Sequence, residues 1–114
     1  MGYRSEVVLV VGKEALPLFL NALATCEMAR KLCYSEADKR IDNYEDGAIL
    51  FHWDHIKWYD TYKEVAALEE FMNDCDTEDM EDHYRFVRTG EDMDDNDTRG
   101  YGFNDIYISR SIDF

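Results

Sequence analysis

Residues 5–11 read SEVVLVV and are followed by Gly12, and this stretch decides how the rest of the chain is arranged. Its five consecutive apolar residues, Val7 to Val11, favour a β-strand because branched side chains pack well on a pleated surface. Successive side chains of a strand point to opposite faces, so an uninterrupted apolar run needs cover on both faces. The stretch therefore predicts a central strand in a sheet that is covered on both sides.

Two later segments have helical periodicity. Residues 15–34 carry apolar residues three and four positions apart, and Pro17 is tolerated there if it lies in the first turn. In the second segment, Thr61 and Glu64 have the spacing of a capping box, and an apolar stripe follows them. We expect helices at residues 15–34 and 62–74. The apolar positions of the first are Phe19, Ala22, Leu23, Cys26, Ala29 and Cys33.

Three further strands are expected. In AILFHWDHIKWY, residues 48–59, the apolar positions alternate but their parity switches near Asp54 and His55, so a β-bulge is predicted there. HYRFVRTG, residues 83–90, and DIYISRSIDF, residues 105–114, also have the apolar spacing of strands.

The resulting element order is β-α-β-α-β-β, which predicts an α+β fold. We expect a single domain, residues 1–114, because this length suits one core. Two helices would pack on one mixed sheet as a two-layer sandwich, with an acidic loop joining the last two strands. The sheet face away from the helices could carry rings such as Trp58, Tyr84 and Tyr107 as a contact surface, or these rings could pack beneath loops.

The net charge of −14 is unevenly distributed. Residues 1–59 have a net charge of −2, whereas residues 60–114 hold 17 acidic and five basic residues, a net charge of −12. The apolar fraction of 46% is too high for a disordered acidic chain, so the charge lies on a folded protein. Solubility needs a net charge of only about 2 to 8 in magnitude, so the surplus is either functional or merely tolerated.

Two features of the sequence bear on location. No segment approaches the ~20 apolar residues of a membrane span, and the start of the chain lacks the features of a secretory signal. Cys26, Cys33 and Cys75 are odd in number and form no Cys-x-x-Cys pair, which suits a reducing compartment. We expect a cytoplasmic protein whose cysteines are small core residues.

The acidic stretch EDMDDNDTRGYGFND, residues 91–105, invites comparison with a calcium loop. If the loop begins at Asp92, its sixth position is Asp97 instead of the required Gly. Its twelfth position is Phe103, where a bidentate Glu is needed. We therefore interpret the stretch as a surface and expect no tight metal site, although a weak divalent-cation site stays open wherever carboxylates crowd.

No catalytic arrangement is evident in the sequence. His52 and His55 are three residues apart, so a regular strand directs them to opposite faces, and we interpret both as structural. His83 lies in an acidic connector and is expected to stay solvated. No Gly-x-Ser-x-Gly motif is present, and Gly12-Lys13 lacks the preceding glycine of a phosphate loop. We expect a protein that is not an enzyme and that uses no cofactor.

Four blocks of the sequence are considered together: MGYRSEVV at residues 1–8, HIKWYDTYKEV at 55–65, FVRTGEDMDD at 86–95 and DIYISRSI at 105–112. In that order they resemble a family of small acidic proteins carried by tailed bacteriophages. The family is largely uncharacterised, and it supplies no catalytic residues to transfer. The resemblance implies an accessory protein acting in the cytoplasm of the bacterial host.

The resemblance and the charge together imply how such a protein acts. An acidic phage protein can occupy the nucleic-acid site of a host restriction, CRISPR or recombination enzyme, because spaced carboxylates substitute for phosphates. We therefore predict an inhibitor or modulator that binds a basic host protein and binds neither nucleic acid nor membrane. Aromatic contacts would add specificity to the charge. The predicted contact residues are Asp74, Asp76, Glu78, Asp79, Glu81, Asp82, Glu91, Asp92, Asp94, Asp95, Asp97, Tyr101 and Phe103.

The alternative is a phage accessory protein whose charge is incidental and which self-associates through an aromatic sheet face. Whether the chain is a monomer or a homodimer is open at this point. Salt separates the two hypotheses, because electrostatic capture weakens steeply with ionic strength, whereas an apolar dimer barely responds.

Overall fold

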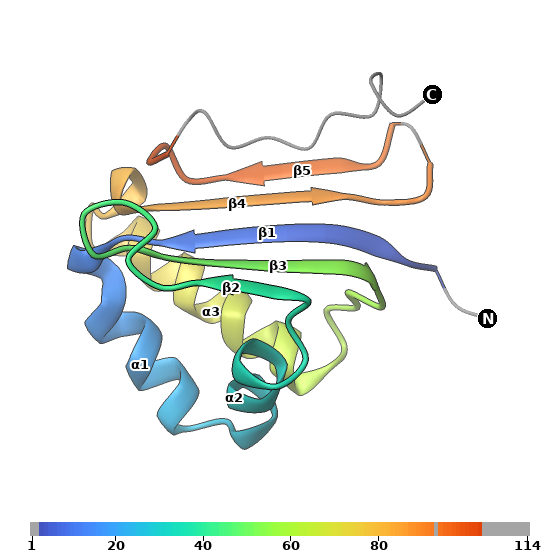
Figure 1. The fold of residues 1–114 in the computed structure, drawn as a ribbon, viewed down its shortest axis with the longest axis horizontal. Coiled ribbons are helices and arrows are strands. Elements are labelled where there is room, and N and C mark those ends of the chain that lie inside the picture. Colours follow the sequence, from blue (N-terminus) through green and yellow to red (C-terminus); the bar gives the residue numbers. More distant parts are fainter. Residues whose placement is uncertain (1–2, 93, 104–114) are drawn as a thin grey trace.

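The structure is a computed structural model that describes residues 3–92 and 94–103. Within these residues, five strands form one antiparallel sheet in the order β2-β3-β1-β4-β5. β1 occupies the middle of the sheet (Figure 1), as the sequence predicts. The strands are β1 (Ser5–Val11), β2 (Lys39–Ile41), β3 (Ile49–Ile56), β4 (Tyr84–Thr89) and β5 (Asn96–Arg99).

The helices pack together on one face of the sheet (Figure 1), so the predicted α+β two-layer arrangement is confirmed. α1 and α2 both contact α3. Short 3-10 turns, η1 (Lys13–Ala15) and η2 (Glu81–His83), precede α1 and β4. None of the described helices is both long and apolar enough to cross a bilayer. The α-helices of the described residues are α1 (Leu16–Ala24), α2 (Glu27–Tyr34) and α3 (Lys63–Thr77).

The predicted strand directions and the first predicted helix are wrong. The sheet is antiparallel throughout its described strands and is not mixed, because side-chain parity does not encode strand direction. The single helix expected at 15–34 is divided, since Cys26 has extended backbone angles. The Arg30 guanidinium donates to the carbonyl oxygens of Leu23 and Ala24, which satisfies groups left open where α1 ends.

The start of α3 also differs from the prediction. The N-cap residue is Tyr62, and no side chain caps this end, so the capping box of Thr61 and Glu64 is wrong. The segment expected to be an acidic loop contains β5, which pairs with β4. The strand predicted at residues 105–114, with Tyr107, lies outside the described residues.

The central strand is covered on both faces, as expected from its sequence. Val7, Leu9 and Val11 belong to the main core beneath the helices. On the other face, Val10 is fully buried in a smaller cluster with Ala48 and Leu50. Tyr44 and Phe103 pack against this second cluster, whereas Val8 is only partly buried. Cover on the second face therefore comes from loops.

The main core is aromatic, and its rings contact one another from helix to sheet. Trp53 is fully buried and its indole N–H donates to the Leu32 carbonyl oxygen at 3.0 Å. Trp58 and Tyr84 also lie in this core, so the suggestion that they form a contact surface on the opposite face is wrong. Cys33 and Cys75 are buried as expected, and Cys26 is half-buried.

The β-bulge predicted near Asp54 and His55 is present. Ser5 faces Ile56 and Val7 faces Trp53, so β3 has one more residue than β1 over this interval. His55 takes a positive φ of 55°, which is typical of a residue that absorbs such an irregularity. The extra residue keeps Trp53 in the core and resets the parity of the positions that follow.

Candidate partner-binding surface

The predicted acidic contact residues form two groups at opposite ends of β4 (Figure 1). We call Asp74, Asp76, Glu78, Asp79, Glu81 and Asp82 the helix arc, because they lie at the end of α3, in the connection after it and in η2. We call Glu91, Asp92, Asp94, Asp95 and Asp97 the turn arc, because they lie between β4 and β5 and at the start of β5. β4 has six residues, so about 20 Å of strand separates the arcs.

The turn arc is built around Arg88 of β4. The Arg88 side chain is only 13% exposed, and its guanidinium lies 2.5 Å from an Asp95 oxygen and 2.8 Å from an Asp97 oxygen. Arg88 and Asp97 face each other across the β4–β5 pair. Tyr3 adds a hydrogen bond from its hydroxyl to Asp95 at 2.6 Å. Two of the five carboxylates therefore neutralise a largely buried arginine.

Other members of the turn arc hold the start of the chain. Glu91 accepts a hydrogen bond from the Arg4 backbone N–H at 2.6 Å. The backbone N–H of Asp92 donates to the Tyr3 hydroxyl at 3.0 Å. The side chains of Asp92 and Asp94 are exposed. Most of the turn arc thus has a structural task in addition to its charge.

The helix arc has one member with a comparable role, Asp76. It accepts from the Tyr84 hydroxyl at 2.9 Å and pairs with Arg99 at 2.9 Å. Burial and the hydrogen bond to Asp76 both raise the pKa of Tyr84. Arg99 also pairs with Glu69 of α3 at 3.1 Å. These contacts tie β5 to α3.

The other members of the helix arc project into solvent. Asp74, Glu78, Asp79 and Asp82 are exposed, and Glu81 is half-buried. Asp82 lies 3.5 Å from the His83 imidazole, which also lies 3.4 Å from Glu14. His83 is therefore partly buried beside two carboxylates and is not fully solvated as predicted. The helix arc is the more accessible of the two acidic groups.

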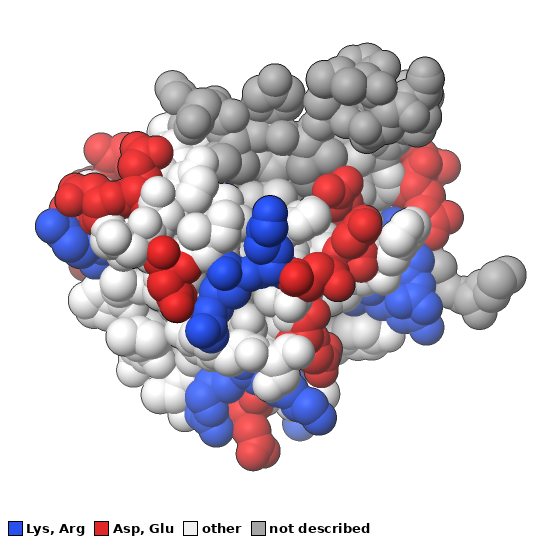
Figure 2. All heavy atoms as spheres, in the orientation of Figure 1, with Lys and Arg blue, Asp and Glu red and all other residues white. Residues whose placement is uncertain are grey.

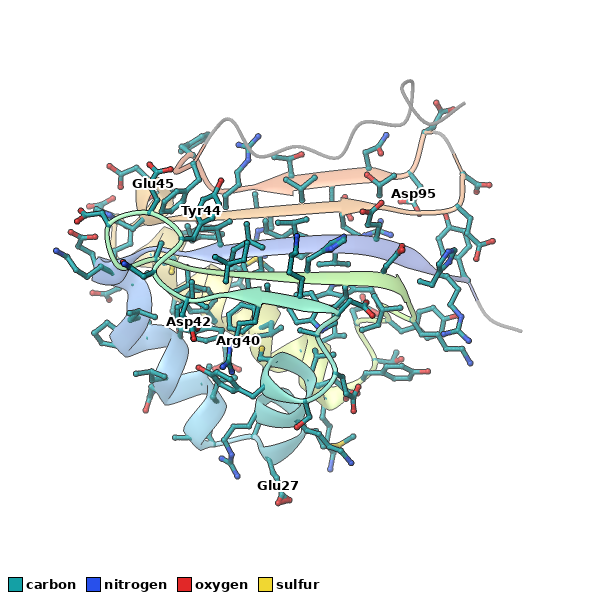
Figure 3. The ribbon with its side chains drawn as sticks, in the orientation of Figure 1. Glu27, Arg40, Asp42, Tyr44, Glu45 and Asp95 are labelled. Carbon is teal, nitrogen blue, oxygen red and sulfur yellow. The ribbon has the colours of Figure 1, made fainter. Side chains whose placement is uncertain are left out.

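The two arcs do not merge into one continuous acidic strip. Arg88 and Arg99 lie between the two arcs and project from the helix side of β4 and β5. Each of these arginines pairs with two carboxylates. The face seen in Figure 2 likewise carries Lys and Arg interspersed with Asp and Glu. Figure 3 places Asp95 at the β4–β5 turn and Glu45 at the other end of the sheet. The acidic surplus is therefore divided among separate patches.

Tyr101 is the aromatic residue presented beside the helix arc. It is 73% exposed, and its backbone N–H donates to the Glu81 carbonyl oxygen at 2.6 Å. The next residue, Gly102, donates to Tyr84, and a Cβ at Gly102 would come within 2.5 Å of the Asp82 carbonyl oxygen. Glycine is thus required for this close approach. A hollow of about 410 Å³ beside the ring is lined by Asp76, Glu81 and Arg99.

Phe103, the second predicted aromatic contact, has a different environment. Its ring lies 6.3 Å from that of Tyr44, and both pack against the small cluster on the second face of the sheet. It is half-buried. Of the two predicted aromatic contacts, therefore, Tyr101 is the one that combines an exposed ring with neighbouring acidic side chains.

The histidines form no obvious reactive centre. His52 lies 2.8 Å from a Glu6 carboxylate oxygen across the sheet, and His55 is exposed at the bulge. Among residues 3–92 and 94–103, no group of three or more His, Cys, Asp or Glu side chains is arranged to hold a metal ion.

Arg88 and Arg99 are the important residues that sequence reasoning missed. Both lie next to the acidic stretch, and an opposite-charge pair across a hairpin was the available signal.

Comparison of the chain with family models, curated proteins and solved structures finds no match.

Proposed function

We propose that this chain is a phage-encoded binding protein that inhibits or modulates a basic, nucleic-acid-handling protein in the cytoplasm of its bacterial host. The helix arc is the contact surface, and the protein acts by occupying a basic site without catalysing a reaction. The phage setting comes from the sequence resemblance. The observation that carries the proposal is the exposed Tyr101 ring beside exposed carboxylates.

Charge and aromatic surface have different tasks in this proposal. Exposed ion pairs contribute only about 0–1 kcal/mol each, so carboxylates alone give weak and non-specific attraction. Their summed field instead accelerates the encounter with a basic groove. A buried aromatic ring is a common source of interface affinity, and Tyr101 offers one on a turn held by backbone hydrogen bonds. The carboxylates therefore attract the partner, and the Tyr101 ring slows its dissociation.

The helix arc also has a firm support. α3 buries Phe71 and Met72 just before the arc and Cys75 beneath it, all three in the main core. The Arg99 bridge to Asp76 and Glu69 joins the arc to β5. A surface that is fixed before binding loses less conformational entropy when the partner docks.

The test is capture of host proteins from phage-infected lysate at low and high salt, followed by binding kinetics with the protein retained. One variant carries Asp74→Asn, Glu78→Gln and Asp79→Asn. The control carries Glu27→Gln, Glu36→Gln and Asp54→Asn, which are exposed acids outside both arcs. Both variants lose three negative charges. Figure 3 shows Glu27 far from the β4–β5 turn.

We expect the helix-arc variant to associate about tenfold more slowly and with a shallower salt dependence, while the control stays near wild type. Tyr101→Ala should chiefly accelerate dissociation. Equal losses in both triple variants would mean that net charge alone acts and would refute a specific surface. Binding that resists high salt would favour the alternative of apolar association.

A further inference from the structure

A second hollow, of about 610 Å³, lies at the turn-arc end of the molecule. Its walls come from the start of the chain, the β3–α3 connection, α3 and the β4–β5 hairpin. Segments distant in sequence therefore converge there, and Tyr3 joins two of them by bonds to Tyr59 and Asp95. Its volume is within the range of ligand-binding clefts, about 300–1,000 Å³.

The lining of this hollow is strongly acidic. Asp60, Glu69, Asp95 and Asp97 contribute four carboxylates against the single guanidinium of Arg88. Arg88 is already paired with two of them, and Glu69 pairs with Arg99 outside the lining. Asp60 is exposed. The hollow thus repels anions such as nucleotides and favours a cation.

The remaining walls are aromatic. Trp58 lies between Trp53 and Phe86, with ring centroids 5.5 Å and 5.8 Å away, and Tyr59 completes the lining beside it. Faces of aromatic rings attract cations, and planar guanidinium groups stack on them better than ammonium groups do. Because Trp58 and Phe86 are packed in the core, the half-buried rings of Tyr3 and Tyr59 are the ones available to a cation, and with the acidic walls they favour a guanidinium over an ammonium.

Trp58 gives an independent indication of a ligand. It is only 9% exposed, and its indole N–H has no acceptor among the described residues. A buried donor without a partner costs free energy and is uncommon outside functional sites. The indole nitrogen itself has almost no accessible surface, so a peptide carbonyl of an arginine-containing segment reaches it only if the walls of the hollow move apart on binding.

We propose that this hollow is a receptor for one arginine side chain of a protein partner. The inference rests on the proposed function in that the partner is the same basic protein. It adds that recognition includes a defined arginine about one strand length from the Tyr101 contact. The helix arc then governs the encounter, and the hollow selects the partner by a single side chain.

The test uses the whole protein and follows its indole N–H signals by NMR. The chain has two tryptophans, and the buried, hydrogen-bonded Trp53 serves as an internal control. The probe is N-acetyl-arginine amide. Its matched control is N-acetyl-citrulline amide, which has nearly the same shape without the charge. N-acetyl-lysine amide tests the preference for a guanidinium.

We expect the arginine probe to move the Trp58 signal saturably with a Kd of about 1–10 mM, and to leave the Trp53 signal in place. The lysine probe should bind several-fold more weakly, and the citrulline probe should cause no saturable shift. A short neutral peptide containing one arginine should bind more tightly than the capped amino acid, which separates a protein partner from a free metabolite. Equal effects of arginine and citrulline would refute the proposal.

Variants locate the site. Asp60→Asn removes a lining charge without touching the Arg88 pairs, and it should weaken binding of the arginine probe about threefold to tenfold. Glu70→Gln, an exposed acid of α3 outside the lining, should change nothing. The helix-arc triple variant should also bind the probe normally. If the wild-type protein captures the partner but its Trp58 signal does not respond to the arginine probe, the receptor is refuted and the proposed function stands. If the Trp58 signal responds but no partner is captured, the proposed function is refuted and the arginine site stands.

Discussion

The turn arc and the helix arc contain similar residues but use them differently. In the turn arc, Asp95 and Asp97 enclose Arg88, while Glu91 holds the backbone near the start of the chain. In the helix arc, Asp76 alone has a comparable contact with an arginine, and Asp74, Glu78 and Asp79 project outward. The same density of acidic residues therefore forms a structural support at one end of β4 and an open surface at the other.

This difference shows that acidic residues cannot be ranked as contact residues by charge density alone. A carboxylate that neutralises a buried guanidinium contributes little field to an approaching partner, because the pair acts as a dipole. The helix arc retains its charge and is the better candidate for steering. The turn arc is the better candidate for shaping a hollow.

The largest expected effect comes from the centre of the turn arc. Arg88→Met removes the guanidinium and leaves Asp95 and Asp97 close together without their partner. We expect a loss of about 3 kcal/mol in the free energy of unfolding, measured by urea denaturation. Lys31→Met, at an exposed position of α2, is the control and should change stability by about 0.5 kcal/mol or less. An Arg88→Met protein as stable as the control would remove the distinction between the arcs.

The second prediction concerns the buried core residues beneath the helix arc. Cys75 lies under the arc between Asp74 and Asp76, and burial raises the pKa of its thiol to about 12, as it does for Cys33 in the core. At pH 8 both thiols are protonated and unreactive. We expect each to react with an aromatic disulfide reagent more than about 100-fold more slowly than half-buried Cys26, as mass spectrometry of the labelled sites would show. Rapid labelling of Cys75 but not of Cys33 would mean that the C-terminal end of α3, beneath the helix arc, unfolds locally.

The same thiols predict how stability depends on alkaline pH. Their pKa values are raised in the folded state, so the unfolded chain releases these protons first as the pH rises above about 9. The stability they contribute is complete below that pH and is lost as the pH rises towards about 12. Thermal unfolding midpoints should therefore fall across this interval, and Cys33→Ala should reduce the slope.

The smallest expected effect concerns the exposed members of the helix arc. Asp74→Asn, Glu78→Gln and Asp79→Asn should each change the free energy of unfolding by no more than about 0.5 kcal/mol. Asp95→Asn with Asp97→Asn should instead destabilise the protein, because both carboxylates pair with Arg88. Thermal unfolding of the two sets side by side measures the contrast. Equal destabilisation would show that the helix arc is structural too.

Much of the fold could be predicted from local patterns. The apolar run of β1 indicates a central strand, and the parity switch at Asp54 and His55 indicates the bulge. The division between α1 and α2 could not be read from periodicity, because Phe19 and Ala29 face the core on either side of it. β2 is a short polar edge strand, and nothing in its sequence separates it from a surface loop.

The candidate surface was predictable in composition but not in pairing. The sequence identifies where carboxylates are dense, yet the contact of Arg88 with Asp97 depends on the register of the β4–β5 pair. That register follows from how many residues the intervening turn uses, which no side-chain pattern specifies. The hollow beside Trp58 forms where four segments distant in sequence converge, so local sequence patterns could not predict it.

The central position of β1 has a consequence for how the protein forms during synthesis. β1 leaves the ribosome before its two partners, β3 and β4, which begin about 45 and 80 positions later in the chain. Until Thr89 is outside the exit tunnel, the most apolar segment of the chain has an unpaired edge. Pairing at such long sequence separation is slow. Chaperones that hold nascent apolar segments should therefore engage residues 5–11 before any partner can engage the acidic half.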